Sequence, residues 1–204
     1  MLTATAKPTG SSVPPLEAGT YVARCVQLVD LGDQMNELAG RLQRQVMILW
    51  EIPSERLEIN GEDKPRVMSK TYTLSLSDRA KLRADLETWR GLPFSDEELK
   101  GFDLRNILNK GCMLTVVTKA SKATGKPYNT IGGVSKLIRG LEVPAAETPI
   151  FAFDLDDKDS LEAIEALPNW IRERIEQSET YKNLVADRDN ASMSDVSEDD
   201  IPDF

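Results

Sequence analysis

Residues 45–52 read QVMILWEI, an almost continuously apolar run that Pro53 brings to an end. Runs of this length that are rich in β-branched and aromatic residues are typical of strands. Two further stretches of the same character flank it: GTYVARCVQLVD at 19–30 and VMSKTYTLSL at 67–76. The three runs predict the first three strands of a β-rich domain.

The segments between these strands carry weaker signals. Residues 31–42 are of mixed composition and predict a connector. Residues 54–65 are polar and contain Asn60-Gly61, a dipeptide that is typical of tight turns. The sequence therefore predicts that the second strand ends at Pro53 and that the third begins after this polar segment.

The spacing of apolar residues becomes helical after the third strand. Leu82, Leu86 and Trp89 fall on one face of a helix, and Ser77 or Asp78 is the expected N-cap. The sequence therefore predicts a helix directly after the third strand.

Two more strands are expected after the helical region. They are CMLTVVTK at 112–119 and a looser strand at 128–138, and a short helix with a capping box begins at Ser95 before them. The order β-β-β-α-β-β is that of a five-stranded OB-type barrel with its helix between strands 3 and 4. We therefore predict a mainly β fold built on such a barrel.

The composition changes after Pro144. Residues 149–153 are apolar enough to lie against the barrel, and helices are expected at 161–167 and from Pro168, with Trp170 on the apolar face of the second. The predicted parts are a flexible N-terminal segment (1–18), the barrel domain (19–143), a C-terminal helical extension packed on the barrel (144–186) and a disordered acidic tail (187–204).

Charge is unevenly distributed along the chain. Residues 1–149 carry 20 Lys and Arg against 18 Asp and Glu, a net charge of +2, whereas residues 150–204 carry 5 against 16, a net charge of −11. This asymmetry fits a polyanion-binding domain whose acidic tail serves partners or competes for the binding groove. The simpler interpretation is a soluble domain with a solvating tail.

The composition also argues against an enzyme. The chain has no histidine, the commonest general base and a member of most nucleophile pairs. Cys25 and Cys112 lie in apolar runs and are predicted to be buried free thiols, too few for a Cys-rich zinc site. The acidic residues within 154–159 lack the glycine of a calcium loop and include Lys158, so a helix N-terminus is the preferred interpretation. We predict a non-enzymatic protein with no cofactor and no metal.

The strands and loops of the predicted barrel carry both features of a single-strand binder, which are cations for phosphates and aromatic faces for bases. The predicted DNA-binding residues are Arg24, Arg41, Arg44, Arg66, Lys70, Tyr72, Lys119, Lys122, Lys126 and Tyr128. The hairpin 119–128 is the strongest candidate, because the loop after strand 4 flanks the nucleic-acid face of an OB barrel. Tyr72 shares a strand face with Leu74 and Leu76, so a core position is an equally good interpretation.

The last residues of the sequence, SEDDIPDF at 197–204, resemble the C-terminal tip of bacterial single-stranded DNA-binding proteins, which ends in Asp residues followed by Ile-Pro-Phe. The matching residues are Asp199, Asp200, Ile201, Pro202 and Phe204, whereas Asp203 departs from the pattern. The stretches QVMILWEIP, SKTYTLSLSDRAKLRADLETWRG and GFDLRNILNKGCMLTVV resemble an OB-fold family of such proteins encoded by tailed bacteriophages, over about residues 19–181.

This resemblance implies sequence-independent binding and protection of single-stranded DNA during replication or recombination. It also implies that the tip recruits replication or recombination proteins. No apolar run approaches the roughly 18 residues of a membrane span. Residues 1–15 are rich in Ala, Thr, Ser and Pro and lack the charged-then-apolar order of a secretory signal, so we expect a cytoplasmic protein, in the host cytoplasm if a phage encodes it. The alternatives are an OB-like adaptor that binds protein rather than DNA, and a metal-dependent phosphodiester-cleaving enzyme using residues 154–159.

Overall fold

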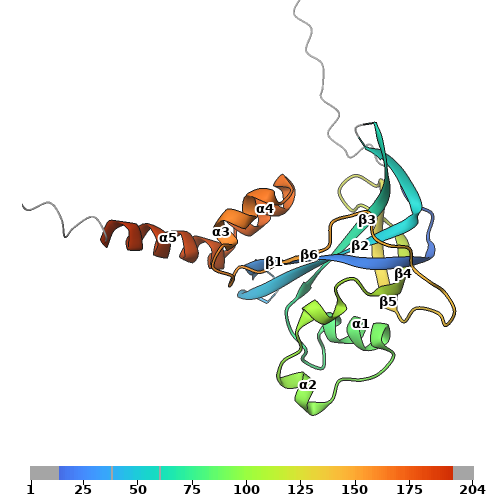
Figure 1. Cartoon of the computed structure of the whole chain (residues 1–204), viewed down its shortest axis with the longest axis horizontal. Helices are drawn as coiled ribbons and strands as arrows, with labels where there is room; N and C mark the ends of the chain where they lie inside the picture. Colours follow the sequence, from blue (N-terminus) through green and yellow to red (C-terminus); the bar gives the residue numbers. More distant parts are fainter. Residues whose placement is uncertain (1–13, 38, 60, 195–204) are drawn as a thin grey trace, which may run out of the picture.

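The chain folds into a curled, mainly antiparallel sheet followed by helices (Figure 1). The computed structural model describes residues 14–194 except Leu38 and Asn60. Its elements are β1 (Gly19–Asn36), β2 (Arg41–Ile59), β3 (Glu62–Thr73), α1 (Lys81–Arg90), α2 (Asp96–Lys100), η1 (Leu104–Ile107), β4 (Gly111–Ala120), β5 (Pro127–Ser135), β6 (Phe151–Phe153), α3 (Ser160–Ala163), η2 (Ile164–Ala166), α4 (Asn169–Glu176) and α5 (Glu179–Ser194).

The five long strands form one path in the order β3-β2-β1-β4-β5, and all four neighbouring pairs are antiparallel. β5 also contacts β3 at the opposite end of this order, so the sheet curls into a half-barrel. The short β6 pairs in parallel with the middle of β1. The prediction of a mainly β fold, with helices between the third and fourth strands and at the C-terminal end, is confirmed.

Strand β1 is longer than the sequence predicts. The segment 31–42 was expected to be a connector, but the β1–β2 ladder continues to the pair Asn36–Arg41. The register shifts between Asp30 and Gly32, and Gly32 adopts a φ of 69°. Such an irregularity breaks the alternation of apolar and polar residues, so the second half of the strand carries no recognisable pattern.

Strand β2 also continues beyond its predicted end. Pro53 lies within the strand rather than after it, and the register shifts between Ile52 and Arg56, where the ladder tolerates a residue without an N–H donor. The predicted connector 54–65 is therefore mostly hairpin. The turn itself lies where the sequence places it, because Gly61 adopts a φ of 82° between the two strands.

The helices after β3 confirm the helical spacing but not the predicted N-cap. Helix α1 begins after Ala80, and neither Ser77 nor Asp78 caps it, because the Asp78 carboxylate binds Arg83 instead. Helix α2 has the expected capping box, in which the Ser95 side chain accepts a hydrogen bond from the third residue of the helix.

Two hydrophobic cores lie on opposite faces of the sheet, and β2 contributes to both. Val46, Ile48 and Trp50 point into the core beneath α1, where the Trp50 and Trp89 rings are 6.0 Å apart. The intervening residues pack against the C-terminal segment, in a core made of Val26, Val29, Leu31, Met47, Leu49, Phe153, Leu155, Ile164, Leu167, Ile171 and Ile175. Burial of both faces explains why residues 45–52 are apolar at almost every position.

The C-terminal extension covers the outer face of β1 and β2, and α5 projects away from the body (Figure 1). Trp170 of α4 was expected on the apolar face but is 54% exposed, because Ile171 and Ile175 occupy that face alone. The disorder predicted for 187–204 is corrected for 187–194, since α5 continues to Ser194, whereas 195–204 lie outside the described residues.

The start of the described chain is ordered as well. Leu16 is buried in the first core, and its backbone exchanges two hydrogen bonds with the Asn129 side chain. Cys25 and Cys112 are buried free thiols, as predicted, and burial raises the pKa of both. In the described part of the chain, no helix combines the length and the apolar character that crossing a bilayer requires.

Candidate nucleic-acid interface

A groove of about 560 Å³ opens where β3 ends and α1 begins, and we call it the basic groove. It is lined by Arg41, Gln43, Arg44, Thr71, Tyr72, Thr73, Ser75, Ser77, Arg79, Ala80 and Lys81. Four of these residues are cationic, five carry a hydroxyl group and none is acidic. Such a lining offers positive charge and hydrogen-bond donors to an anionic ligand.

Three segments of the chain bring these residues together. Arg41 opens β2, Thr73 closes β3, and Lys81 opens α1. The backbone N–H of Leu74 donates to the carbonyl oxygen of Arg44 at 2.8 Å, which holds the segment after β3 against β2. The cations of the groove are therefore presented by the ends of regular elements and by the short turn that joins them.

The charges of Arg41 and Arg79 are not neutralised by neighbours. Among the residues that the structure describes, neither guanidinium forms an ion pair, and both side chains are exposed. Lys81 contacts one carboxylate oxygen of Asp85 at 3.0 Å but remains largely exposed. Exposed cations without a partner are available to a phosphate group at little desolvation cost.

The N-terminus of α1 adds to the positive character of the groove. No side chain caps this end of the helix, and its first turn holds no acidic residue. The unsatisfied N–H groups and the helix dipole therefore favour a negative charge at the same place as Lys81.

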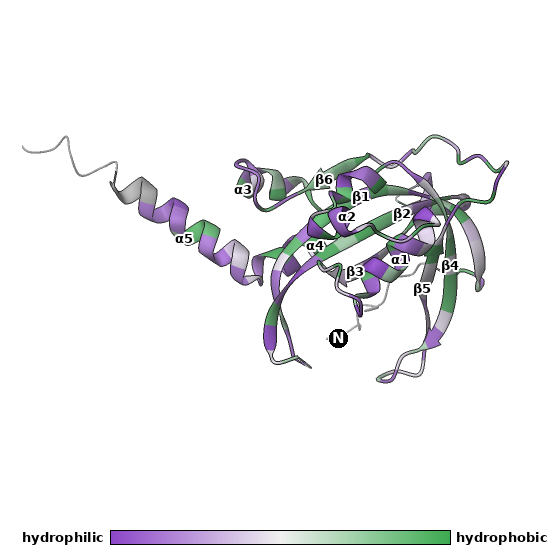
Figure 2. Cartoon of the chain, turned by 90° about the horizontal axis from the view of Figure 1, so that it is seen from below, coloured by the Kyte–Doolittle hydropathy of each residue, from purple (hydrophilic) through white to green (hydrophobic). Residues whose placement is uncertain are grey.

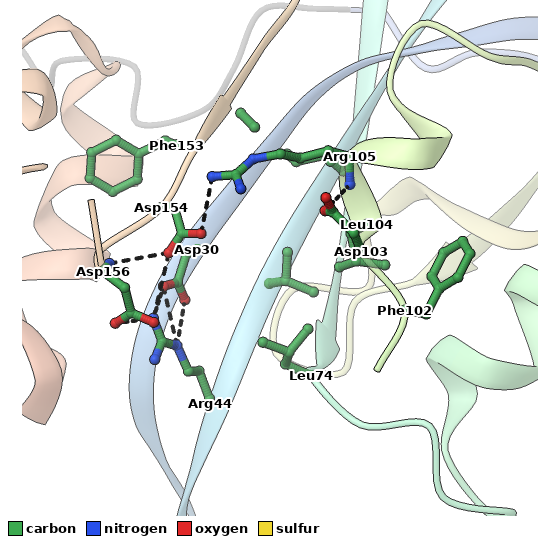
Figure 3. Close-up of a pocket in the computed structure, with 13 residues that line it drawn as sticks. Asp30, Arg44, Leu74, Phe102, Asp103, Leu104, Arg105, Phe153, Asp154 and Asp156 are labelled. Carbon is green, nitrogen blue, oxygen red and sulfur yellow. Dashed lines mark hydrogen bonds and ion pairs between the residues drawn. The ribbon is translucent and has the colours of Figure 1, made fainter. Parts of the chain in front are cut away.

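Arg44 also lines the basic groove and is the only lining cation held by several carboxylates in the described structure. Its side chain binds the buried Asp30, and Nη2 lies 2.9 Å from Asp156 Oδ1 and 3.8 Å from Asp154 Oδ1. Figure 3 shows the three carboxylates converging on the guanidinium from β1 and from the turn after β6. Arg44 is thus anchored, whereas Arg41 and Arg79 are not.

The β4–β5 hairpin forms a second exposed basic surface, as the sequence predicts. Lys119, Lys122 and Lys126 are exposed and form no ion pair with any residue described. Tyr128 is 47% exposed and stands directly opposite Lys119 on the ladder, so its ring is accessible beside a cation. Figure 2 shows this hairpin and the β1–β2 hairpin extending from the same side of the sheet.

Lys70 and Tyr72 do not face solvent as nucleic-acid contacts would. Tyr72 is only 4% exposed, and its hydroxyl donates to Asp85 Oδ2 at 2.9 Å. Lys70 Nζ donates to the same oxygen at 2.7 Å. These side chains connect β3 to α1, so the core interpretation of Tyr72 is the one that the structure supports.

Arg24 and Arg66 hold other parts of the chain in place. The Arg24 guanidinium donates to the carbonyl oxygens of Asn109, Val143 and Pro144 at 2.7, 2.7 and 3.0 Å, which fixes the connector after β5. Arg66 donates to the carbonyl oxygen of Pro14 at 2.7 Å. Of the predicted DNA-binding residues, the structure places Arg41, Arg44 and the buried Tyr72 at the basic groove, and Lys119, Lys122, Lys126 and Tyr128 on the hairpin.

The sequence prediction does not include Arg79 and Lys81, because they follow the predicted N-cap, Ser77 or Asp78, and so fall in the expected helix rather than in a strand or a loop. The sequence does hold a usable signal, since both cations lie in the same short segment as Ser75 and Ser77, which is rich in hydroxyl groups. The predicted partner-binding residues Asp199, Asp200, Ile201, Pro202 and Phe204 lie outside the described residues.

The described residues contain no group of three or more His, Cys, Asp or Glu side chains arranged to hold a metal ion. Asp154 and Asp157 instead lie 3.3 and 3.5 Å from Arg105 Nη2. In comparisons with known proteins, no family model matches the chain and no curated protein matches it.

Proposed function

We propose that this protein binds single-stranded DNA without sequence preference and protects it during replication or recombination. The observation that carries the proposal is the basic groove, whose lining holds four cations and no carboxylate. Phosphate attraction supplies most of the affinity of sequence-independent binders, and Arg41 and Arg79 are the free cations that would supply it here.

The β4–β5 hairpin supports single-stranded rather than double-stranded DNA as the ligand. Tyr128 offers an exposed ring next to Lys119, and bases stack on such rings only when they are not paired within a duplex. Arg41 of the groove lies at the start of β2, directly after the turn of the β1–β2 hairpin. This hairpin extends from the same side of the sheet as the β4–β5 hairpin (Figure 2), so one DNA strand would contact both surfaces.

We further propose that the half-barrel is of the OB type. The order β3-β2-β1-β4-β5, the contact between β5 and β3, and the helix between β3 and β4 support this assignment. In such barrels the loops after the first and fourth strands flank the ligand. The groove begins at the first of these loops, and the lysine-rich hairpin is the second.

The proposed mode of action is non-catalytic. The cations hold phosphates, the exposed ring holds a base, and the acidic C-terminal tip recruits replication or recombination proteins, as its resemblance to bacterial single-strand binders suggests. Helix α5 supports this last part, because it carries the chain away from the body before the tip begins (Figure 1).

A protein-binding adaptor is the second candidate, and one observation favours it. Trp170 on α4 is 54% exposed, and exposed tryptophans are enriched in protein interfaces. An adaptor would use this surface and would have no need of the uncompensated cations in the groove.

The direct test is a titration of the full chain against labelled single-stranded DNA, double-stranded DNA and RNA at several salt concentrations. The proposal predicts preferential binding of single-stranded DNA, with log affinity falling linearly with log salt. The slope is about −0.7 per phosphate neutralised, so roughly four contacts give about −3. Absence of binding at low salt would leave the adaptor as the better account.

A further inference from the structure

Arg44 lines two cavities at once. It contributes to the lining of the basic groove and also borders a separate cavity of about 250 Å³ between β1, β2, the η1 segment and the turn after β6. In Figure 3 the carboxylates of Asp30, Asp154 and Asp156 surround its guanidinium on the side of this second cavity. Three carboxylates therefore contact Arg44, although no acidic residue lines the basic groove itself.

The three carboxylates do not have the same role. Asp30 is 7% exposed, accepts a hydrogen bond from the backbone N–H of Gly32 at 3.0 Å, and binds Arg44 through both Nε and Nη2. Its ion pair is therefore part of the folded structure. The Asp156 side chain is 68% exposed and meets Arg44 only at Nη2, so a competing anion can replace it at little cost.

The turn after β6, which carries Asp154 and Asp156, is held beside Arg44 by contacts on both of its sides. Leu155, between the two aspartates, is buried in the second core, and its N–H donates to Asp30 at 3.3 Å. On the other side, Arg105 binds Asp154 at 3.3 Å. The folded extension thus holds both aspartates beside Arg44.

We propose that Asp156, assisted by Asp154, is an affinity-determining residue of the basic groove, because it binds the same Arg44 guanidinium that a phosphate of bound DNA would contact from the groove. This inference rests on the proposed function. Binding would exchange the Asp156–Arg44 ion pair for a phosphate–Arg44 ion pair, and the displaced carboxylate would turn to solvent. The C-terminal extension would thereby limit the affinity of the barrel.

The test compares Asp156→Asn with Asp159→Asn. Both substitutions remove one negative charge from an exposed side chain in the same segment, but Asp159 makes no contact with Arg44 in the described structure. Asp156→Asn is expected to tighten binding of a labelled single-stranded oligonucleotide by about two- to fivefold at low salt, the range of an exposed ion pair. The gain should shrink at high salt, because salt screens exposed charges. Asp159→Asn should stay within the error of the wild-type value.

Thermal unfolding of both variants checks that the fold is retained. If the wild-type protein binds DNA and the two variants tighten binding equally, the effect is one of net charge and the inference is overturned. It is also overturned if neither variant changes the affinity. If the wild-type protein does not bind single-stranded DNA at all, the proposed function itself fails, and that result is distinct from the other two.

Discussion

Tyr72 donates a hydrogen bond from its hydroxyl group to Asp85 Oδ2 at 2.9 Å, which ties β3 to α1 inside the molecule. Lys70 shares that oxygen at 2.7 Å, and Lys81 approaches the other oxygen at 3.0 Å. Burial alone would raise the pKa of the Asp85 carboxyl, but the hydrogen bonds from Lys70, Lys81 and Tyr72 together hold it below its usual value.

Replacing Asp85 with Asn should therefore destabilise the protein. The substitution removes the charge that Lys70 and Tyr72 bind, and hydrogen bonds to a charged group contribute roughly 1.5–3 kcal/mol. Urea denaturation followed by circular dichroism measures the loss in the free energy of unfolding. Glu162→Gln is the matched control, because Glu162 is exposed and should change stability by less than about 0.5 kcal/mol.

The stability of the wild type and that of Asp85→Asn should also depend differently on pH. Because the folded-state pKa of Asp85 lies below the unfolded value, its contribution is fully present above the unfolded pKa of about 3.9. It is lost as the pH falls through the folded pKa. The stability gap between wild type and Asp85→Asn should thus be constant from pH 7 to about 5 and narrow below about 4. A gap that does not narrow in acid would contradict the assigned role of Asp85.

Gly32 and Gly40 offer a matched test of how the C-terminal extension packs. Both have a positive φ, 69° and 60°, so an alanine costs about 1–2 kcal/mol at either position. A Cβ at Gly32 would also lie 2.5 Å from Ser178 Oγ, whereas the space around Gly40 is open. Gly32→Ala should therefore lower the free energy of unfolding more than Gly40→Ala. Equal losses in the free energy of unfolding would mean that the C-terminal extension does not pack closely against β1 at Gly32.

Arg24 is expected to act on stability rather than on DNA binding. Arg24→Lys keeps the charge but cannot reproduce the fork that reaches Asn109, Val143 and Pro144, so the midpoint of urea denaturation should fall. The affinity of the folded variant for single-stranded DNA should stay the same. Arg139→Lys, at an exposed position with no ion pair among the described residues, is the control. A loss of affinity without a loss of stability would mean that Arg24 contacts the DNA.

Much of the fold could be predicted because its signals are local. The apolar run at 45–52, the turn at Gly61 and the capping box at Ser95 each depend on neighbours in sequence. The second half of β1 could not be predicted, because the irregularity at Gly32 breaks the pattern and the pairing partner lies across a hairpin. The exposure of Trp170 depends on which helix face meets the sheet, and the sequence alone does not specify that orientation.

The candidate site was predictable only in part for a similar reason. The hairpin 119–128 carries its lysines and tyrosine within ten residues, so its composition reveals it. The basic groove gathers Arg41, Arg79 and Lys81 from three segments, and only the folded sheet brings them together. The contact of Arg44 with Asp156 spans more than 100 positions and leaves no trace in local composition.

The hairpin lysines should contribute through phosphate contacts. Replacing Lys119, Lys122 and Lys126 together with Ala should weaken binding of single-stranded DNA and make the slope of log affinity against log salt shallower by about 2, at about 0.7 per contact. The fold should be retained, because all three side chains are exposed. Replacing the exposed Lys100, Lys158 and Lys182 with Ala changes the net charge equally and should leave the slope unchanged. If both triple variants lose the same affinity, the hairpin is not a specific contact.

The central claim is that the basic groove holds the phosphates, and the double variant Arg41→Gln/Arg79→Gln tests it most directly. Neither arginine has an ion-pair partner in the described structure, so stability should be unaffected. The measurement is the affinity for a labelled single-stranded oligonucleotide as a function of salt concentration, for the variant and the wild type in parallel. The account predicts weaker binding at low salt and a slope shallower by about 1.4, the value for two lost phosphate contacts. An unchanged affinity and slope in a folded variant would contradict it.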